Sequence, residues 1–280
     1  MTLALAYPRL LLLLATLESG AAPRSQAVPA GHPRTPIMLY QTDFDRTETL
    51  ISEGGVWSHS GLDWTTVATA NGLAIGTQTG GVGRFDDSYA FLSGFPADQA
   101  ASVVIHKDPK LDTTTQHEVE ILLRWADSAD AARGYECNLS YDGAYAEIVR
   151  WNGAYGDFTY VTPQGSGGPG SVHDGDIFTA QIVGNTITTA LNGIRLAQAK
   201  DSKWSTGNPG IGLFRNGQAG AFPGDYCLTR FSATANPSAV PKAHSTVSVA
   251  VAIISLGFGL LVLIQRRWRP SSRRCFFRIS

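Results

Sequence analysis

Residues 177–199 read IFTAQIV-GN-TITTAL-NG-IRLAQA, three short apolar-rich runs separated by two-residue turn sequences. Gly184-Asn185 separates the first run from the second, and Asn192-Gly193 leads into the third. Asn-Gly suits the type I′ turn of a β-hairpin, because both central positions of that turn need a positive φ angle. The stretch therefore predicts three consecutive antiparallel strands, Ile177–Val183, Thr186–Leu191 and Ile194–Ala199.

Runs of the same kind extend over the middle of the chain, where helical periodicity is almost absent. Asp142-Gly143 predicts a further hairpin, between Tyr135–Tyr141 and Tyr145–Trp151. The other predicted strands are Ile37–Asp43, Thr65–Thr77, Tyr89–Gly94, Ala101–Lys107, Gln116–Trp125, Gly210–Phe214 and Tyr226–Ala233. About a dozen short strands with tight turns predict an all-β fold, an antiparallel two-sheet sandwich or barrel.

Alternation within Gln116–Trp125 separates two faces of that strand, because successive side chains point to opposite sides. The apolar, core-facing set is His117, Val119, Ile121, Leu123 and Trp125. The opposite set is Glu118, Glu120, Leu122 and Arg124. In the following strand Cys137 shares the apolar face, and Glu136 and Asn138 lie opposite.

Cys137 and Cys227 both fall among predicted core residues, in strands that are far apart in the sequence. A disulfide between them would close a loop of 90 residues, which the chain-entropy model values at roughly 4–5 kcal/mol. The alternative is a pair of buried free thiols.

The N-terminus has the order of a secretory signal. Arg9 precedes the apolar run Leu10–Leu17, and small residues follow at Ser19-Gly20-Ala21. We expect a signal peptide over residues 1–21, cleaved after Ala21 or later, near Ala27. Residues 22–35 are rich in Pro, Ala and Arg and predict a disordered lead-in before a domain over residues 36–235.

The C-terminus predicts a membrane anchor. Residues 236–246 contain prolines and small residues and predict a stalk. Val247–Ile264 is apolar and uncharged, and residues 265–280 then carry six arginines and no acid. Because basic residues stay on the cytoplasmic side, we expect a single-pass protein with its domain outside and its C-terminus, including Cys275, in the cytoplasm.

The charge divides in the same way. The net charge of −1 consists of +6 in residues 265–280 and −7 in the rest of the chain. An acidic exported part lacks the basic footprint of a nucleic-acid-binding protein. The basic tail is explained by topology and by anionic lipid.

Residues 175–202, together with STGNPGIGLF at Ser205–Phe214 and the final run Tyr226–Thr234, resemble the C-terminal half of concanavalin A-like lectin/glucanase domains, including their laminin-G-like branch. Tyr40–Arg46 and Trp64-Thr65-Thr66 resemble the start of such domains, so the resemblance covers about residues 37–235. It implies a jelly roll of two curved antiparallel sheets with a grooved concave face and with the last strand beside the first. The superfamily contains lectins, adhesion modules, glycosidases and polysaccharide lyases, so the fold does not fix the function.

Glu118 and Glu120 are the candidate catalytic residues. They lie two apart on one strand, as in the E-x-D-x-(x)-E motif of family-16 glucanases, in which paired carboxyl groups attack the sugar and donate a proton. Here the central acid is glutamate, and the third position is Leu122 or Leu123. A lyase would instead need a neutralising Arg with a His/Tyr pair, and no such pattern is evident.

A calcium site is predicted at the rim of the sandwich. Asp43, Asp45 and Asp225 lie near the first and last strands, which pair in this fold, and the resemblance implies that related domains often hold Ca²⁺ at a rim. Carboxylate and carbonyl oxygens are the ligands that Ca²⁺ prefers.

The candidate ligand-binding residues are aromatic groups predicted in loops and polar groups predicted on one strand face. They are Trp151, Tyr155 and Trp204, with Arg124, Glu120, Glu136 and Asn138. The sequence thus favours a cell-surface binding module for a carbohydrate or an extracellular protein. A glycan-active enzyme that uses Glu118 and Glu120 is the alternative, and a structural envelope protein without a ligand is a third class.

Overall fold

The structure is a computed structural model of the whole chain. It describes residues 39–59, 65–78, 86–109, 116–128, 131–154, 156–216, 224–235 and 237. The predicted signal peptide, lead-in, membrane span and tail lie outside these residues, as does all of the predicted stalk except residue 237. No helix in the described part of the chain is long and apolar enough to cross a membrane.

The described residues form fourteen β-strands and no α-helix, which confirms the all-β prediction. The strands are β1 (Leu39–Thr42), β2 (Thr65–Ala70), β3 (Leu73–Gly76), β4 (Asp86–Phe91), β5 (Gln99–Lys107), β6 (Gln116–Ser128), β7 (Ala131–Ser140), β8 (Ala146–Gly153), β9 (Phe158–Tyr160), β10 (Ile177–Val183), β11 (Thr186–Leu191), β12 (Ile194–Lys200), β13 (Asn208–Asn216) and β14 (Tyr226–Thr234).

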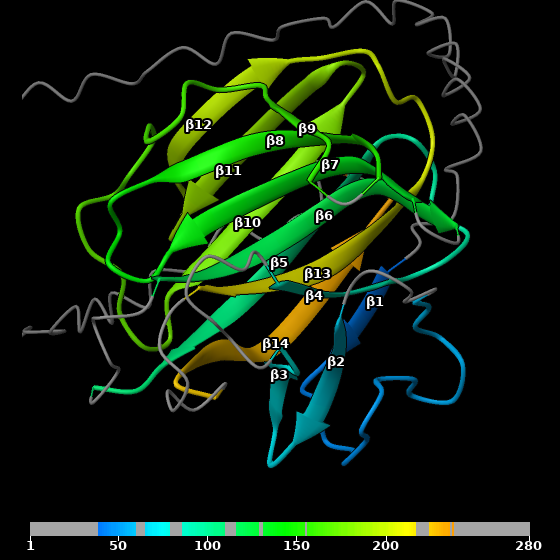
Figure 1. Cartoon of the computed structure of the whole chain (residues 1–280), viewed down its shortest axis with the longest axis vertical. Helices are drawn as coiled ribbons and strands as arrows, with labels where there is room; N and C mark the ends of the chain where they lie inside the picture. Colours follow the sequence, from blue (N-terminus) through cyan, green and yellow to red (C-terminus); the bar gives the residue numbers. More distant parts are fainter. Residues whose placement is uncertain are drawn as a thin grey trace, which may run out of the picture. The chain divides into compact units, whose positions relative to one another are not determined.

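The strands form one continuous sheet that curls into two layers. One layer runs β12-β11-β10-β5-β14-β3-β2, with β1 also paired to β14, and the other runs β4-β13-β6-β7-β8-β9. Neighbouring strands are antiparallel except β2 and β4, a short parallel pair that joins the layers. Figure 1 shows β6, β7 and β8 lying across β10, β11 and β12. The first and last strands pair, as the resemblance implied.

The main core lies between the two layers. Val103 and Ile105 of β5 face Val119 and Ile121 of β6 within one cluster of buried side chains. Phe178 of β10 belongs to the same cluster. Burial of this apolar surface is the dominant favourable contribution to folding.

Local sequence signals located most of the strands. The hairpin at Asn192-Gly193 has φ angles of 50° and 81°, as a type I′ turn requires. The predicted single strand Thr65–Thr77 is in fact two strands, because Asn71-Gly72, with φ angles of 53° and 77°, turns the chain back between β2 and β3. The short edge strand β9 was not predicted.

A β-bulge in β6 breaks the predicted alternation. Arg124 has a positive φ angle of 50°, and the register with β7 shifts between Leu123 and Ala126. The extra residue sends Trp125 to the opposite face from Ile121, into a second buried cluster with Leu122. The prediction that Trp125 shares the main core and that Arg124 shares the face of Glu120 is therefore wrong.

The predicted disulfide is not formed. Cys137 and Cys227 are both buried and both free. Each is inward-facing, as alternation predicted, but they belong to different layers, β7 and β14. The Cys227 thiol donates to the backbone carbonyl of Gly224 at 3.3 Å instead.

Candidate functional site

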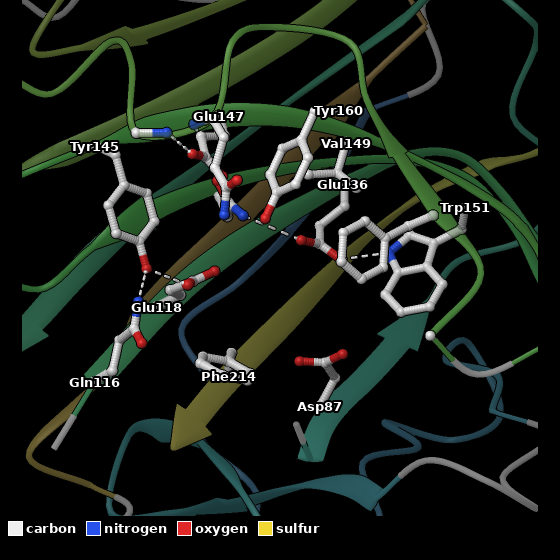
Figure 2. A pocket seen from close by; sticks show the side chains of 15 residues that line it. Asp87, Gln116, Glu118, Glu136, Tyr145, Glu147, Val149, Trp151, Tyr160 and Phe214 are labelled. Atoms are coloured by element: carbon white, nitrogen blue, oxygen red, sulfur yellow. Dashed lines mark hydrogen bonds between the residues drawn. The ribbon is translucent and has the colours of Figure 1, made fainter. Parts of the chain in front are cut away.

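A cleft of about 460 Å³ lies on the outer face of the layer formed by β4, β13, β6, β7, β8 and β9, the face turned away from the main core. Its walls carry acidic, amide and aromatic side chains. The lining residues include Asp87, Gln116, Glu118, Glu136, Asn138, Tyr145, Glu147, Val149, Trp151, Phe158, Tyr160 and Phe214. Figure 2 shows Asp87 and Phe214 on one side of the cleft and Tyr145, Tyr160 and Trp151 on the other.

The strand register explains why these side chains meet. Glu118 and Glu120 on β6 have Ser140 and Asn138 of β7 as direct partners, and Glu136 is the partner of Leu122. Residues two apart on a strand share a face, so the carboxyl groups of β6 and β7 project from the same face. Among the described residues, Glu118, Glu120 and Glu136 place one carboxylate oxygen each within 4.8 Å of the others.

Glu118 lies at the edge of the cleft and is 9% exposed. Its carboxylate accepts a hydrogen bond from the hydroxyl of Tyr145, which in turn accepts one from the side-chain amide of Gln116 (Figure 2). Burial raises the pKa of Glu118 to about 8, and the negative charges of Glu136 and Glu147 act in the same direction. This carboxyl group therefore keeps its proton at neutral pH.

Glu120 is the most deeply placed acid of the group, with 2% of its surface exposed. Its Oε1 atom is buried without a hydrogen-bond partner. A Cβ atom on Gly212 would lie 2.0 Å from Oε2, so the absence of a side chain on β13 makes room for the carboxyl group. Burial, and then the charges of Glu136 and Asp87, hold the pKa of Glu120 well above its usual value.

Two protein side chains donate hydrogen bonds to the Glu136 carboxylate. It accepts a hydrogen bond from the indole nitrogen of Trp151 at 2.6 Å and one from the Asn138 amide at 3.3 Å. Burial raises the pKa of Glu136 to about 7, although both hydrogen bonds act to lower it. Of Glu118 and Glu136, Glu136 therefore ionises at the lower pH.

Glu147 of β8 closes one side of the cleft through the loop after β9. Its carboxylate accepts a hydrogen bond from the backbone N–H of Gly165, and its own N–H donates to the Asn138 side-chain oxygen at 3.0 Å. Burial raises the pKa of Glu147 as well. Asn138 therefore links Glu136 and Glu147 and fixes their positions.

Aromatic rings form the far end of the cleft. Phe158 and Tyr160 of β9 are 40% and 37% exposed, and their rings meet edge to face with centroids 5.5 Å apart. Phe158 also packs against the Trp151 ring at 5.3 Å. Large apolar side chains left exposed beside polar groups are typical of a binding surface.

The predicted binding residues divide between the cleft and other places. Glu136, Asn138 and Trp151 line the cleft, although Trp151 is a buried residue of β8 and not a loop residue as predicted. Tyr155 lies outside the described residues. Trp204 packs elsewhere: its indole nitrogen donates to the Trp151 backbone carbonyl at 2.9 Å.

Arg124 has a structural role. Its guanidinium donates to the backbone carbonyls of Ala97, Trp204 and Gly184 at 2.7 to 2.9 Å, so it ties the β6 bulge to three loops. Among the described residues that line the cleft there is no arginine, lysine or histidine. The described lining of the cleft is therefore acidic.

The three aspartates of the predicted rim site are not gathered in the described structure. Asp43 accepts a hydrogen bond from the guanidinium of Arg230, which already supplies a positive charge to that carboxylate. Asp45 is exposed, and the backbone carbonyl of Asp225 accepts a bond from the Asp108 N–H at 2.8 Å. The described group that has the spacing for a cation is the glutamate group of the cleft.

Sequence reasoning did not identify Asp87, Tyr145, Glu147, Tyr160 and Phe214 as lining residues. Alternation along Ala146–Gly153 could have placed Glu147 on one face with Val149 and Trp151. The others depend on which strands are neighbours in space. For example, β13 lies between β4 and β6, although Asn208 at its start is 80 residues beyond Ser128, the last residue of β6.

A scan against protein-family models found no match, and a search of curated proteins found none either. Solved structures do match. The carbohydrate binding module CBM66 from Bacillus subtilis is 14% identical, with 60% of this chain and 96% of that chain covered and a TM-score of 0.43. A kappa-carrageenase from Zobellia galactanivorans is 10% identical, with 73% and 97% covered and a TM-score of 0.43. Porphyranase B from the same organism is 11% identical, with 74% and 97% covered and a TM-score of 0.43.

These neighbours include a carbohydrate-binding module and glycan-active enzymes. The curled β-sandwich is consistent with the resemblance to concanavalin A-like domains. The identities are only 10 to 14%, so the sugars named for these neighbours apply to those proteins and not to this chain.

Proposed function

We propose that this chain is a membrane-anchored, extracytoplasmic binding module that holds a carbohydrate in the cleft. The observation that supports this most is the convergence of exposed aromatic rings and buried hydrogen-bonding groups on one concave surface. Sugar rings present C–H faces that pack on aromatic rings, and their hydroxyl groups donate to carboxylate and amide oxygens. A cleft of about 460 Å³ has a size typical of small-ligand sites.

The polar side chains of the cleft limit the classes of sugar that we expect to bind. The described lining of the cleft offers no arginine or lysine to pair with an anionic ligand, and an anion buried without a partner is strongly disfavoured. We therefore expect neutral or cationic sugars to bind better than sulfated or uronic-acid polymers.

Binding is tested with the full-length chain, a panel of neutral, amino, uronic and sulfated oligosaccharides, and isothermal titration calorimetry. Tyr160→Ala and Phe158→Ala should each weaken binding of the best ligand about tenfold, a loss of about 1.4 kcal/mol, because each removes an aromatic surface on which sugar C–H groups pack. Ile194→Ala is the matched control, since Ile194 is an exposed apolar residue on β12 that does not line the cleft. The proposal fails if no member of the panel binds, or if the control weakens binding as much as the two variants do.

A specific observation favours a second candidate, a glycan-cleaving enzyme. Glu136 is the cross-strand partner of Leu122, one of the two positions at which the family-16 motif would have its third acid, so β7 supplies a carboxyl group that β6 lacks. Glu118 retains its proton at neutral pH and has the properties of a general acid, whereas Glu136, with two donors and a pKa of about 7, has those of a base or nucleophile. Carboxyl groups about 5–5.5 Å apart are typical of retaining glycosidases.

Cleavage is tested by measuring new reducing ends after incubation with the same panel. Activity that disappears in Glu136→Gln and in Glu118→Gln would establish the enzyme and displace the pure binding function. Absence of products from every oligosaccharide that binds would leave the binding module as the function.

The sequence supports the location. The apolar span Val247–Ile264, followed by six arginines, supports an anchor whose C-terminal end is cytoplasmic, and residues 1–21 support export of the domain. The full-length chain should stay in the membrane pellet after alkaline extraction, and a chain that ends before Val247 should be released. Recovery of the full-length chain in the soluble fraction would contradict the anchor.

A further inference from the structure

Three acids lie close together beside the cleft, and the described lining of the cleft offers them no basic side chain. Glu118 and Glu120 of β6 and Glu136 of β7 each place one carboxylate oxygen within 4.8 Å of the others. All three are at least nine-tenths buried. Like charges at such distances destabilise the fold unless protons or a cation neutralise them.

Glu120 provides an independent observation. Its Oε1 atom is buried and has no hydrogen-bond partner. An unsatisfied buried carboxyl oxygen destabilises the fold, because it has lost its water without gaining a hydrogen-bond donor. A ligand bound to this oxygen would remove that cost.

The Glu120 carboxyl group lies against β13, where glycine leaves room for it. Gly212 has no side chain there, and a Cβ atom at this position would approach Oε2 to 2.0 Å. Asp87 of β4 contributes a further negative charge from the other side of β13. Glu120 is therefore close to several other acids, two of which, Glu118 and Glu136, line the cleft.

We propose that Glu118, Glu120 and Glu136 form a binding site for a hard divalent cation, with calcium as the expected ion, beside the part of the cleft that Glu118 and Glu136 line. An all-oxygen ligand set of carboxylates suits hard cations and not zinc or copper. Calcium binds oxygen at 2.3–2.6 Å, so two of its ligands can lie up to about 5 Å apart, which accommodates the spacing of these atoms. Magnesium needs a near-ideal octahedron and usually keeps several of its waters, so a set of protein carboxylates suits it less well than calcium.

The ion would leave coordination positions open toward the cleft, because three carboxylates supply fewer oxygens than the six to eight that calcium takes. Water or the hydroxyl groups of a bound ligand would fill them. The site differs in place from the rim site predicted at Asp43, Asp45 and Asp225. It does not depend on the proposed carbohydrate function, since the metal alone is the ligand.

The test uses the full-length chain, stripped with EDTA and titrated with calcium chloride or magnesium chloride, with binding followed by calorimetry and by the shift in Tm. Calcium should bind with 1:1 stoichiometry, raise Tm, and bind at least tenfold more tightly than magnesium. Glu120→Gln should weaken calcium at least tenfold and abolish the Tm shift. Asp45→Asn should bind calcium as the unchanged chain does.

Glu118→Gln is the second variant, in case Glu120→Gln does not fold, and circular dichroism checks both. The proposal is overturned if calcium neither binds nor shifts Tm, which would mean that shared protons neutralise the three acids. It is also overturned if Asp45→Asn abolishes binding while the glutamate variants retain it. Calcium binding with no glycan binding would support this site and count against the proposed function only.

Discussion

The two faces of β6 are almost equally buried and chemically opposite. Ile121, which faces the other layer, is fully buried, and Glu120, its neighbour in sequence, is 2% exposed on the cleft side. Burial of Ile121 stabilises the folded state. Burial of the Glu120 carboxyl group destabilises it, because the group loses its hydration and Oε1 gains no hydrogen-bond donor. Burial alone therefore does not identify the residues that stabilise the fold. The face of β6 on which burial is costly, the cleft side, is the one that indicates a function.

The largest expected effect tests the stabilising face. Ile121→Ala removes buried methylene and methyl groups from the main core and should lower the free energy of unfolding by about 2–5 kcal/mol. Urea denaturation measures the change. A loss below about 1 kcal/mol would mean that the inner face of β6 tolerates cavities, and the contrast between the two faces would not hold.

The pH dependence tests the costly face. Glu118 and Glu136 have folded-state pKa values of about 8 and about 7, above the ordinary value near 4.3 that they have when unfolded. Between these pH values the folded state holds protons that the unfolded state has lost. The stability that the two groups contribute to the fold is therefore complete below about pH 4.3 and is lost as the pH rises through about 8. In EDTA, the urea midpoint should decrease from pH 5 to pH 9, which reflects a loss of unfolding free energy on the order of 5 kcal/mol. A midpoint that rises over this range would contradict the assignment.

Glu120→Gln should stabilise the metal-free protein at pH 8, in contrast to Ile121→Ala. The amide needs no proton to remain neutral, so the gain should be about 1–3 kcal/mol at pH 8 and close to zero at pH 5. The measurement is the same denaturation at the two pH values. Equal effects at both would show that charge is not what makes Glu120 costly.

The smallest effect concerns Gly212. A methyl group there would collide with the Glu120 carboxyl group, so Gly212→Ala should cost about 1–2 kcal/mol. In a Glu120→Ala background the same change should cost less, and the double-mutant cycle should give a coupling of about 1 kcal/mol. Additive effects would indicate that the Glu120 side chain moves aside without cost.

The features that the sequence predicted are those that depend on residues close together in the chain. Alternation placed Glu118 and Glu120 on one face and Cys137 on the other, and Asn192-Gly193 located a hairpin. It did not predict the bulge at Arg124, because a positive φ angle at an arginine carries no compositional signal. That single residue moved Trp125 out of the main core.

The cleft as a whole could not be read from the sequence, because it needs the order of strands in space. Glu136 and Asn138 were predicted as binding residues from their face of β7, and they do line the cleft. Asp87 and Phe214 reach it only because β13 lies between β4 and β6. Trp204 and Arg124 are polar or aromatic residues of the type expected in a site, yet their hydrogen bonds to backbone carbonyls are structural.

The pairing of β1 with β14 has a mechanical consequence. Leu39 and Thr234 are direct partners, so the start of the first strand lies beside the end of the last. A force applied across these two ends would load the hydrogen bonds one after another, as in a zipper, because they lie perpendicular to the strands. Under such a force β1 should separate from β14 first, starting at Leu39 and Thr234, while β14 stays paired with β5.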